Sequence, residues 1–180
     1  MAVGPFQALA NLAAQSRKSA KGLPQKIEAV PRWRGLGFVS FGLKFVAPMG
    51  QITEMMEMPG YTRLPGVQPW VVGLSNVRGR LLPLFDLAMY MGGQISQHKK
   101  SHRVFVLETE ELYSGLMVDR AMGMQHFETS KFTKQIESSV PDGLKSYITG
   151  AYRDSNDDAW HVFDFLRLAA DSRFVNASLL

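Results

Sequence analysis

The chain has 180 residues, enough for one ordinary domain, and its apolar fraction of 46% is sufficient for a hydrophobic core. Cysteine is absent, which excludes disulfides, thiolate nucleophiles and zinc sites that use sulfur. The net charge of +4 is misleading, because residues 1–34 carry +5 and the remaining 146 residues carry −1. Proteins that bind nucleic acid through their fold are basic in the folded part, so the charge distribution argues against that function.

Residues 1–34 are predicted to form a basic leader that contains one short amphipathic helix. Pro5 suits the first helical position, and Gly22-Leu23-Pro24 ends the helix. Two interpretations are open: the helix contacts a membrane or a partner, or it packs on the main domain. The short apolar stripe favours packing on the main domain. The chain has no run of about 20 apolar residues, so no membrane span is predicted. The apolar face consists of Phe6, Leu9, Ala10 and Ala13, with Leu12 beside it.

From about residue 36 the apolar period changes to two, which is typical of strands. Residues 39–45 alternate as one long strand or as a hairpin that turns near Gly42. Residues 70–74 and 81–85 flank Arg78-Gly79-Arg80, which predicts a second hairpin. Pro83 within it indicates an edge position or a bulge.

The second half of the chain continues with short strands and turns. Residues 103–107 and 114–118 predict two more strands, and residues 127–146 predict a polar loop with a helical turn. A last hairpin spans residues 147–163, and Asp164 is a good N-cap for a closing helix. The pattern predicts an all-β barrel or sandwich with helices at the ends.

Signals for catalysis or metal binding are poor, so no catalytic, cofactor-binding or metal-binding residue is predicted. His98 and His102 have the spacing of a metal pair, but Lys99, Lys100 and Arg103 beside them favour a solvated basic loop. His161 is expected at a surface or half-buried position. Glu54 and Glu57 are weak evidence for a catalytic carboxylate pair, because the methionines around them suggest a packed or contact surface. Segment 154–158 lacks the Gly and Glu of a calcium loop, so it is predicted to be a hairpin turn.

Two further features concern contact surfaces. Six of the ten methionines cluster in two places, and filling of the core is the favoured role for most of them. Arg78 lies in a turn where Gly79 is free to adopt positive φ. It is predicted either to bind a carboxylate of a partner or to hold a neighbouring loop of its own chain, and spacing does not decide between these. The clustered methionines are Met55, Met56, Met58, Met117, Met122 and Met124.

Residues 64–87, LPGVQPWVVGLSNVRGRLLPLFDL, resemble the most specific block of the CheW-like family. Residues 45–55, 115–119 and 148–164 resemble further blocks in the same order, so the similarity covers about residues 36–170. Gly123 departs from the family, which often has an acidic residue there. The runs 76–83 and 123–127 are most similar to CheW-like adaptors of type IV pilus, or twitching-motility, systems.

The resemblance implies two intertwined SH3-like five-stranded β-barrels over residues 35–175, with a short N-terminal helix and a C-terminal helix. It also implies a non-enzymatic cytoplasmic adaptor, recruited to membrane-associated receptor arrays, without a cofactor and without membrane insertion of its own. The implied partners are the cytoplasmic tip of a methyl-accepting chemotaxis receptor and the regulatory domain of a CheA-type histidine kinase. By position, the receptor-binding residues are Ile52, Glu54, Asn76, Arg78 and Gly79, while the kinase-binding residues are not identified.

Three alternatives to a pilus-system adaptor are considered. An adaptor of the flagellar type differs only in the receptors that it serves. A small nucleic-acid-binding barrel needs exposed aromatic side chains beside basic ones. Salt-dependent retention of residues 36–180 on single-stranded nucleic acid would support it. An enzyme needs a pocket with converging titratable groups, for which the sequence offers no candidate.

Overall fold

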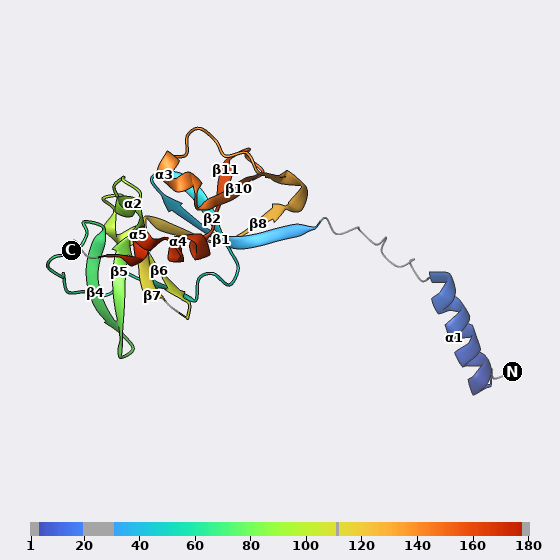
Figure 1. Ribbon diagram of the computed structural model, residues 1–180. Coiled ribbons are helices and arrows are strands. Elements are labelled where there is room, and N and C mark those ends of the chain that lie inside the picture. The colour runs from blue at the N-terminus through green and yellow to red at the C-terminus, as the bar shows by residue number, and fades with distance from the viewer. Residues whose placement is uncertain (1–3, 20–30, 111, 178–180) are drawn as a thin grey trace.

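The computed structural model describes residues 4–19, 31–110 and 112–177 (Figure 1). The strands are β1 (Arg32–Ser40), β2 (Leu43–Pro48), β3 (Glu54–Glu57), β4 (Val71–Val77), β5 (Arg80–Asp86), β6 (Arg103–Glu108), β7 (Tyr113–Val118), β8 (Arg120–Glu128), β9 (Phe132–Thr133), β10 (Ile148–Arg153) and β11 (Ala159–Phe163). The helices are α1 (Pro5–Ser19), α2 (Leu87–Tyr90), α3 (Asp142–Lys145), α4 (Phe165–Ala169) and α5 (Ser172–Val175), with 3₁₀ turns η1 (Lys99–Ser101) and η2 (Thr129–Lys131).

The strands form two sheets that share the chain in an interleaved order. One sheet has the order β8-β1-β2-β11-β10-β9, and the other has the order β3-β6-β7-β5-β4. The chain begins the first sheet with β1 and β2, builds the whole second sheet, and returns to complete the first. The mostly β fold with two intertwined units is confirmed, and the five-strand prediction holds for the second sheet. The first sheet is larger than predicted because the two-residue strand β9 adds to it.

Turn chemistry explains why the chain reverses where it does. Phe41 and Gly42 have φ of 56° and 71°, so β1 and β2 form a hairpin and not one long strand. Positive φ at both central residues matches the right-handed twist of the flanking strands. The hairpins β4–β5, β6–β7 and β10–β11 also pair as the sequence predicted. Asp164 caps α4 as predicted, since its side chain accepts a hydrogen bond from the Leu166 N–H.

One aromatic core joins the two sheets. Phe38 of β1 stacks on Phe45 of β2 and meets Phe105 of β6 edge to face, with ring centroids 5.2 and 5.4 Å apart. Phe163 and Phe165 complete the cluster, and all five side chains are at most 1% exposed. Since this core receives side chains from both sheets, the two units stabilise each other.

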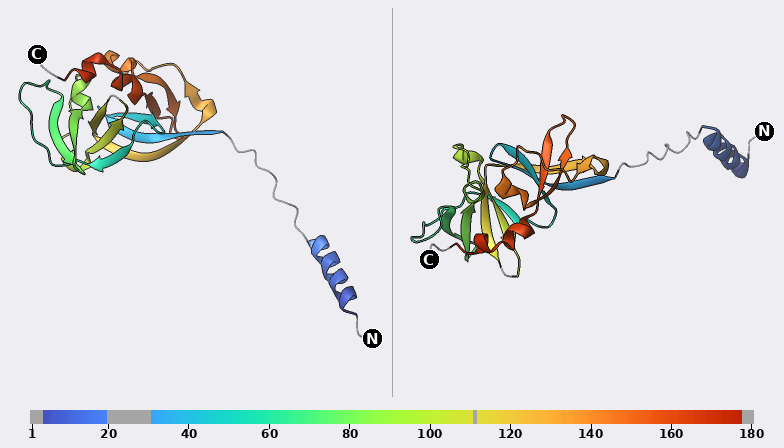
Figure 2. Two further views of the ribbon diagram at one scale, coloured as in Figure 1. Left: turned by 60° about the horizontal axis from the view of Figure 1, so that its bottom comes forward. Right: turned by 45° about the horizontal axis from the view of Figure 1, so that its top comes forward.

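The C-terminal helices α4 and α5 (red in Figure 2) return to the second sheet, where the Phe174 ring of α5 meets the Tyr90 ring of α2 edge to face. Phe174 of α5 is fully buried and stacks on Trp70, with ring centroids 5.8 Å apart. Arg173 pairs with Asp171 at 3.0 Å, and the Tyr147 hydroxyl also donates to Asp171. The Arg173 guanidinium is the main cause that holds the pKa of the Asp171 carboxyl well below its usual range. The single closing helix that the sequence predicted is therefore two short helices, α4 and α5. Aromatic contacts and this polar cluster hold α5 in place.

Pro83 and α1 differ from the expectations. Pro83 lies in β5, which is an interior strand between β7 and β4, but the ladder with β7 begins only at Leu84. Proline has no backbone N–H to donate, and Pro83 lies where β5 is paired with β4 alone. Helix α1 forms as predicted but buries none of its residues, so the expected packing on the main domain is wrong. In the described part of the chain, no helix is long and apolar enough to cross a bilayer.

The methionines divide between core and surface. Met117 is buried, and Met56, Met58 and Met122 pack against buried clusters, so the prediction of core filling is confirmed for these four. Met55 and Met124 are both exposed and are the exceptions to a prediction made for most of the methionines. Met55 lies on the edge strand β3 and Met124 on the edge strand β8.

Candidate functional site

The turn between β4 and β5 brings three of the predicted site residues together. Arg78 and Gly79 have φ of 53° and 83°, the pattern of a type I′ turn. The Asn76 side-chain oxygen accepts a hydrogen bond from the Gly79 N–H at 2.9 Å and fixes the turn. Glycine adopts this conformation freely, whereas arginine does so at a cost. The turn therefore presents Arg78 in a conformation that local preference alone does not select.

A bidentate ion pair joins this turn to the opposite edge of the same sheet. The Arg78 guanidinium donates to both carboxylate oxygens of Glu54, at 2.7 and 3.2 Å. Glu54 begins β3, one edge of the sheet, while β4 is the other edge. The sheet must curl strongly for these groups to meet. The side chain of Arg78 is nevertheless 78% exposed, so the pair is accessible to a partner.

The fifth predicted residue, Ile52, takes a different position. It precedes β3 and packs, partly buried, against the core that joins the two sheets. Thr53 N–H donates to the Val106 carbonyl at 2.9 Å, which ties this segment to β6. Ile52 therefore supports the strand that carries Glu54, whereas Glu54 and Arg78 face solvent.

Sequence reasoning missed the two residues that follow the turn, Arg80 and Leu81, and the two partners of Arg80. The Arg80 guanidinium pairs with Glu108 at 2.9 Å and lies 3.9 Å from the centroid of the Tyr113 ring. Leu82 and Leu84 point inward, so the period of two along the strand places Leu81 outward. Leu81 is 62% exposed. The alternation in this strand was the available signal for Leu81. The partners of Arg80 depend on contacts between strands, which spacing does not reveal.

The CheW-like domain model matches residues 34–173, which is most of the chain. The chain belongs to this family. It is 41% identical to the protein PilI of Pseudomonas aeruginosa over 175 residues, which cover 97% of each chain. It is also 29% identical over 85 residues to the chemotaxis protein CheW of Helicobacter pylori, covering 47% of this chain and 52% of that protein.

A solved structure supports the same fold for this CheW-like chain. The scaffolding protein TtCheW of Thermoanaerobacter tengcongensis superimposes with a TM-score of 0.64. The alignment covers 76% of this chain and 92% of that one at 17% sequence identity. The similarity therefore shows the fold, and function has to be argued from the site.

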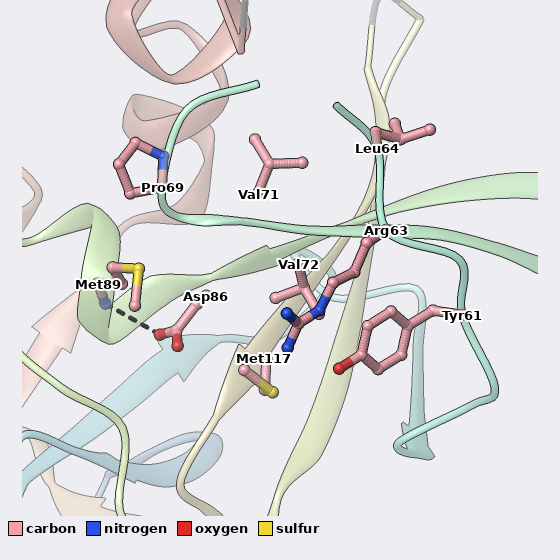
Figure 3. Close-up of a pocket in the computed structure, with 9 residues that line it drawn as sticks. All are labelled: Tyr61, Arg63, Leu64, Pro69, Val71, Val72, Asp86, Met89 and Met117. Atoms are coloured by element: carbon pink, nitrogen blue, oxygen red, sulfur yellow. Dashed lines mark hydrogen bonds between the residues drawn. The ribbon is translucent and has the colours of Figure 1, made fainter. Parts of the chain in front are cut away.

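Next to the second sheet, the CheW-like domain has a cavity of about 390 Å³ (Figure 3). Arg63 and Tyr61 extend into it from the segment before β4, and Asp86 faces it from the end of β5. The Asp86 side chain accepts a hydrogen bond from the Met89 N–H at 2.9 Å and so caps α2. Burial raises the pKa of its carboxyl. This helix cap explains the buried carboxylate.

The other polar candidates of the sequence are accounted for by packing or pairing. His102 is buried with its ring Nε2 2.8 Å from the Ser96 carbonyl, so the prediction of a solvated loop fails for it but holds for the exposed His98. His161 is 1% exposed, which corrects the half-buried expectation, and burial lowers its pKa. Glu57 lies 3.6 Å from Arg103. Among the described residues, no group of three or more candidate ligands could hold a metal ion.

Proposed function

We propose that this CheW-like protein is a non-enzymatic adaptor that couples methyl-accepting chemotaxis receptors to a CheA-type histidine kinase. Similarity to PilI over almost the whole chain supports a role in a chemosensory system that controls type IV pilus twitching motility. The protein would act in the cytoplasm, in arrays to which membrane receptors recruit it. A CheW-like domain that fills most of the chain supports action through partners.

The observation that carries the proposal is the exposed Glu54–Arg78 pair. Local preference disfavours arginine at this turn position, and an exposed ion pair compensates little of that cost. A residue that costs stability and remains exposed fits a binding role. Arg78 can contact the receptor directly, or it can hold β3 in the shape that the receptor recognises. A guanidinium already oriented by Glu54 suits either role, because little side-chain entropy is lost on binding.

Calorimetric titration with a receptor cytoplasmic tip, and separately with the kinase regulatory domain, tests the proposal. We expect micromolar binding to both. Arg78→Ala should weaken receptor binding about tenfold, which is about 1.4 kcal/mol. Arg167→Ala is the matched control, since Arg167 is another exposed arginine paired with a carboxylate, Asp164, at 3.4 Å. Binding of the wild type to neither partner would refute the adaptor function.

A comparison with Glu54→Ala separates the two roles of Arg78. If Arg78 acts by holding β3, Glu54→Ala, Arg78→Ala and the double variant should weaken receptor binding equally. If Arg78 contacts the receptor, Arg78→Ala should cost more than Glu54→Ala. Restoration of twitching but not of swimming, in strains that lack each adaptor, distinguishes the pilus system from the flagellar one.

A further inference from the structure

A second surface lies where the two sheets meet. It involves none of the residues of the β4–β5 turn that carries Arg78. A pocket of about 420 Å³ opens between the β1–β2 turn, the segment before β6, and the crossing from β7 to β8. The chain passes from one sheet to the other at this crossing. The lining residues are Val39, Gly42, Ser96, His98, Ser101, Asp119 and Arg120.

The floor of the pocket is fixed by one buried carboxylate. Asp119 is 6% exposed and accepts hydrogen bonds from the Phe41 N–H at 3.1 Å and from the Ser96 N–H. The His102 ring, also buried, lies 2.8 Å from the Ser96 carbonyl. Both oxygens of Asp119 are therefore occupied by the protein itself. The three segments that build the pocket are held together before any partner arrives, so binding there costs little ordering.

The rim of the pocket is basic. His98 and Arg120 line it, and Lys99 and Lys100 lie on the same 3₁₀ turn as His98. All four side chains are exposed, and within the described ranges none of them forms an ion pair. Eight other basic residues of the folded body do pair with carboxylates: Lys44, Arg78, Arg80, Arg103, Lys145, Arg153, Arg167 and Arg173.

This concentration of unpaired positive charge contrasts with the charge of the body around it. Residues 35–180 carry a net charge of −1. Of their Lys and Arg side chains that form no ion pair within the described ranges, Lys99, Lys100 and Arg120 lie together at this rim, whereas Arg63, Lys131 and Lys134 lie elsewhere. Charged groups that are gathered on one rim attract a partner of opposite sign and orient it. The apolar side chain of Val39 in the same pocket provides a contact for a side chain of a peptide.

We propose that this pocket and its basic rim bind an acidic segment of a partner protein. The inference rests on the proposed function, in that the chain acts through partners, and it adds a contact separate from the Glu54–Arg78 pair. The carboxylates of the partner would meet the side chains of Lys99, Lys100 and Arg120. The fixed floor would set the position of the partner's backbone.

Titration of the ¹⁵N-labelled full chain with an acetylated oligoglutamate peptide tests the proposal by NMR. We expect shifts confined to Gly42, residues 96–102 and Arg120, with affinity that falls about tenfold between low and physiological salt. The double variant Lys99→Glu/Lys100→Glu should abolish these shifts. Lys131→Glu/Lys134→Glu is the matched control, since it reverses two exposed lysines elsewhere and should leave the shifts unchanged.

The following outcomes overturn the proposal or separate it from the adaptor function. Absence of shifts, or equal loss in the control variant, would show that there is no specific site. Equal binding of single-stranded DNA at the same residues would indicate a nucleic-acid surface, and equal binding of inorganic phosphate would indicate a small-anion site. If receptor and kinase bind normally but the peptide does not, this inference fails and the adaptor function stands. If the peptide binds while receptor and kinase do not, only the adaptor function fails.

Discussion

Arg78→Asn separates the cost of the turn conformation from the ion pair with Glu54. Arg78 has φ of 53°, and a residue other than glycine held in this region costs about 1 kcal/mol or more. Asparagine adopts this conformation more readily, and Asn-Gly is a favoured pair for a type I′ turn. The substitution therefore relieves part of the cost at Arg78 and removes the ion pair at the same time.

The structure sets the size of both contributions. The pair is bidentate, but Arg78 is 78% and Glu54 32% exposed, so it contributes about 0.2–1 kcal/mol. Relief of the backbone cost is of similar size and opposite sign, about 1 kcal/mol. In the wild type the free energy of unfolding should therefore change by less than about 1 kcal/mol. In the Glu54→Ala background the pair is already lost, so Arg78→Asn should stabilise by about 1 kcal/mol and raise Tm by about 2–4 °C.

Urea unfolding, followed by circular dichroism for the four proteins of this double-mutant cycle, measures both contributions. Arg78→Gly is a control that removes the backbone cost without adding a side chain. A loss of 1 kcal/mol or more for Arg78→Asn in the Glu54→Ala background, about one tenth of a typical domain stability, would refute the argument from strain.

Four more predictions concern stability. Burial lowers the pKa of His161. The stability that depends on neutral His161 should therefore be fully present above about pH 6.5 and should decline as the pH falls toward the folded-state pKa. Urea unfolding midpoints, measured at several pH values, should depend less on pH in His161→Gln than in the wild type. Ser114→Ala should be neutral or stabilising, within about 1 kcal/mol, because the buried hydroxyl has no hydrogen-bond partner in the described structure. Phe163→Ala should cost about 3–5 kcal/mol, measured by urea unfolding, because the ring is fully buried against four other aromatic rings. Deletion of residues 1–30 should leave Tm unchanged in calorimetry, because α1 buries none of its residues.

Specific results would contradict these predictions. An undiminished pH dependence in His161→Gln would assign acid destabilisation to other groups. A loss above about 2 kcal/mol in Ser114→Ala would indicate a hydrogen bond that the hydroxyl makes in solution. A cost below about 1 kcal/mol for Phe163→Ala would show that the two sheets do not depend on their shared core. A lower Tm after the deletion would indicate that α1 contacts the domain.

Several features could be predicted from sequence because they depend on neighbouring residues. Gly42 and Gly79 permit the positive φ that the two turns require, so the hairpins fall where the sequence indicates. Asp164 caps α4 by accepting a hydrogen bond from the N–H of Leu166, two residues further along the chain. The block 64–87 identified the family, and the domain model matches over residues 34–173. These features need no knowledge of how the sheets pack.

The remaining features depend on contacts between segments far apart in the chain. A period of two shows which residues share a strand face, but it does not show which face the other sheet covers, and for this reason His161 was misplaced. The amphipathic stripe of α1 predicts a helix but names no surface to cover it. Arg78 meets Glu54 although they lie at opposite edges of the sheet, so their contact depends on how all five strands are arranged and not on neighbouring residues. Sequence thus determined the strands, the turns and the family, while the tertiary structure determined which charges pair and which remain available to partners.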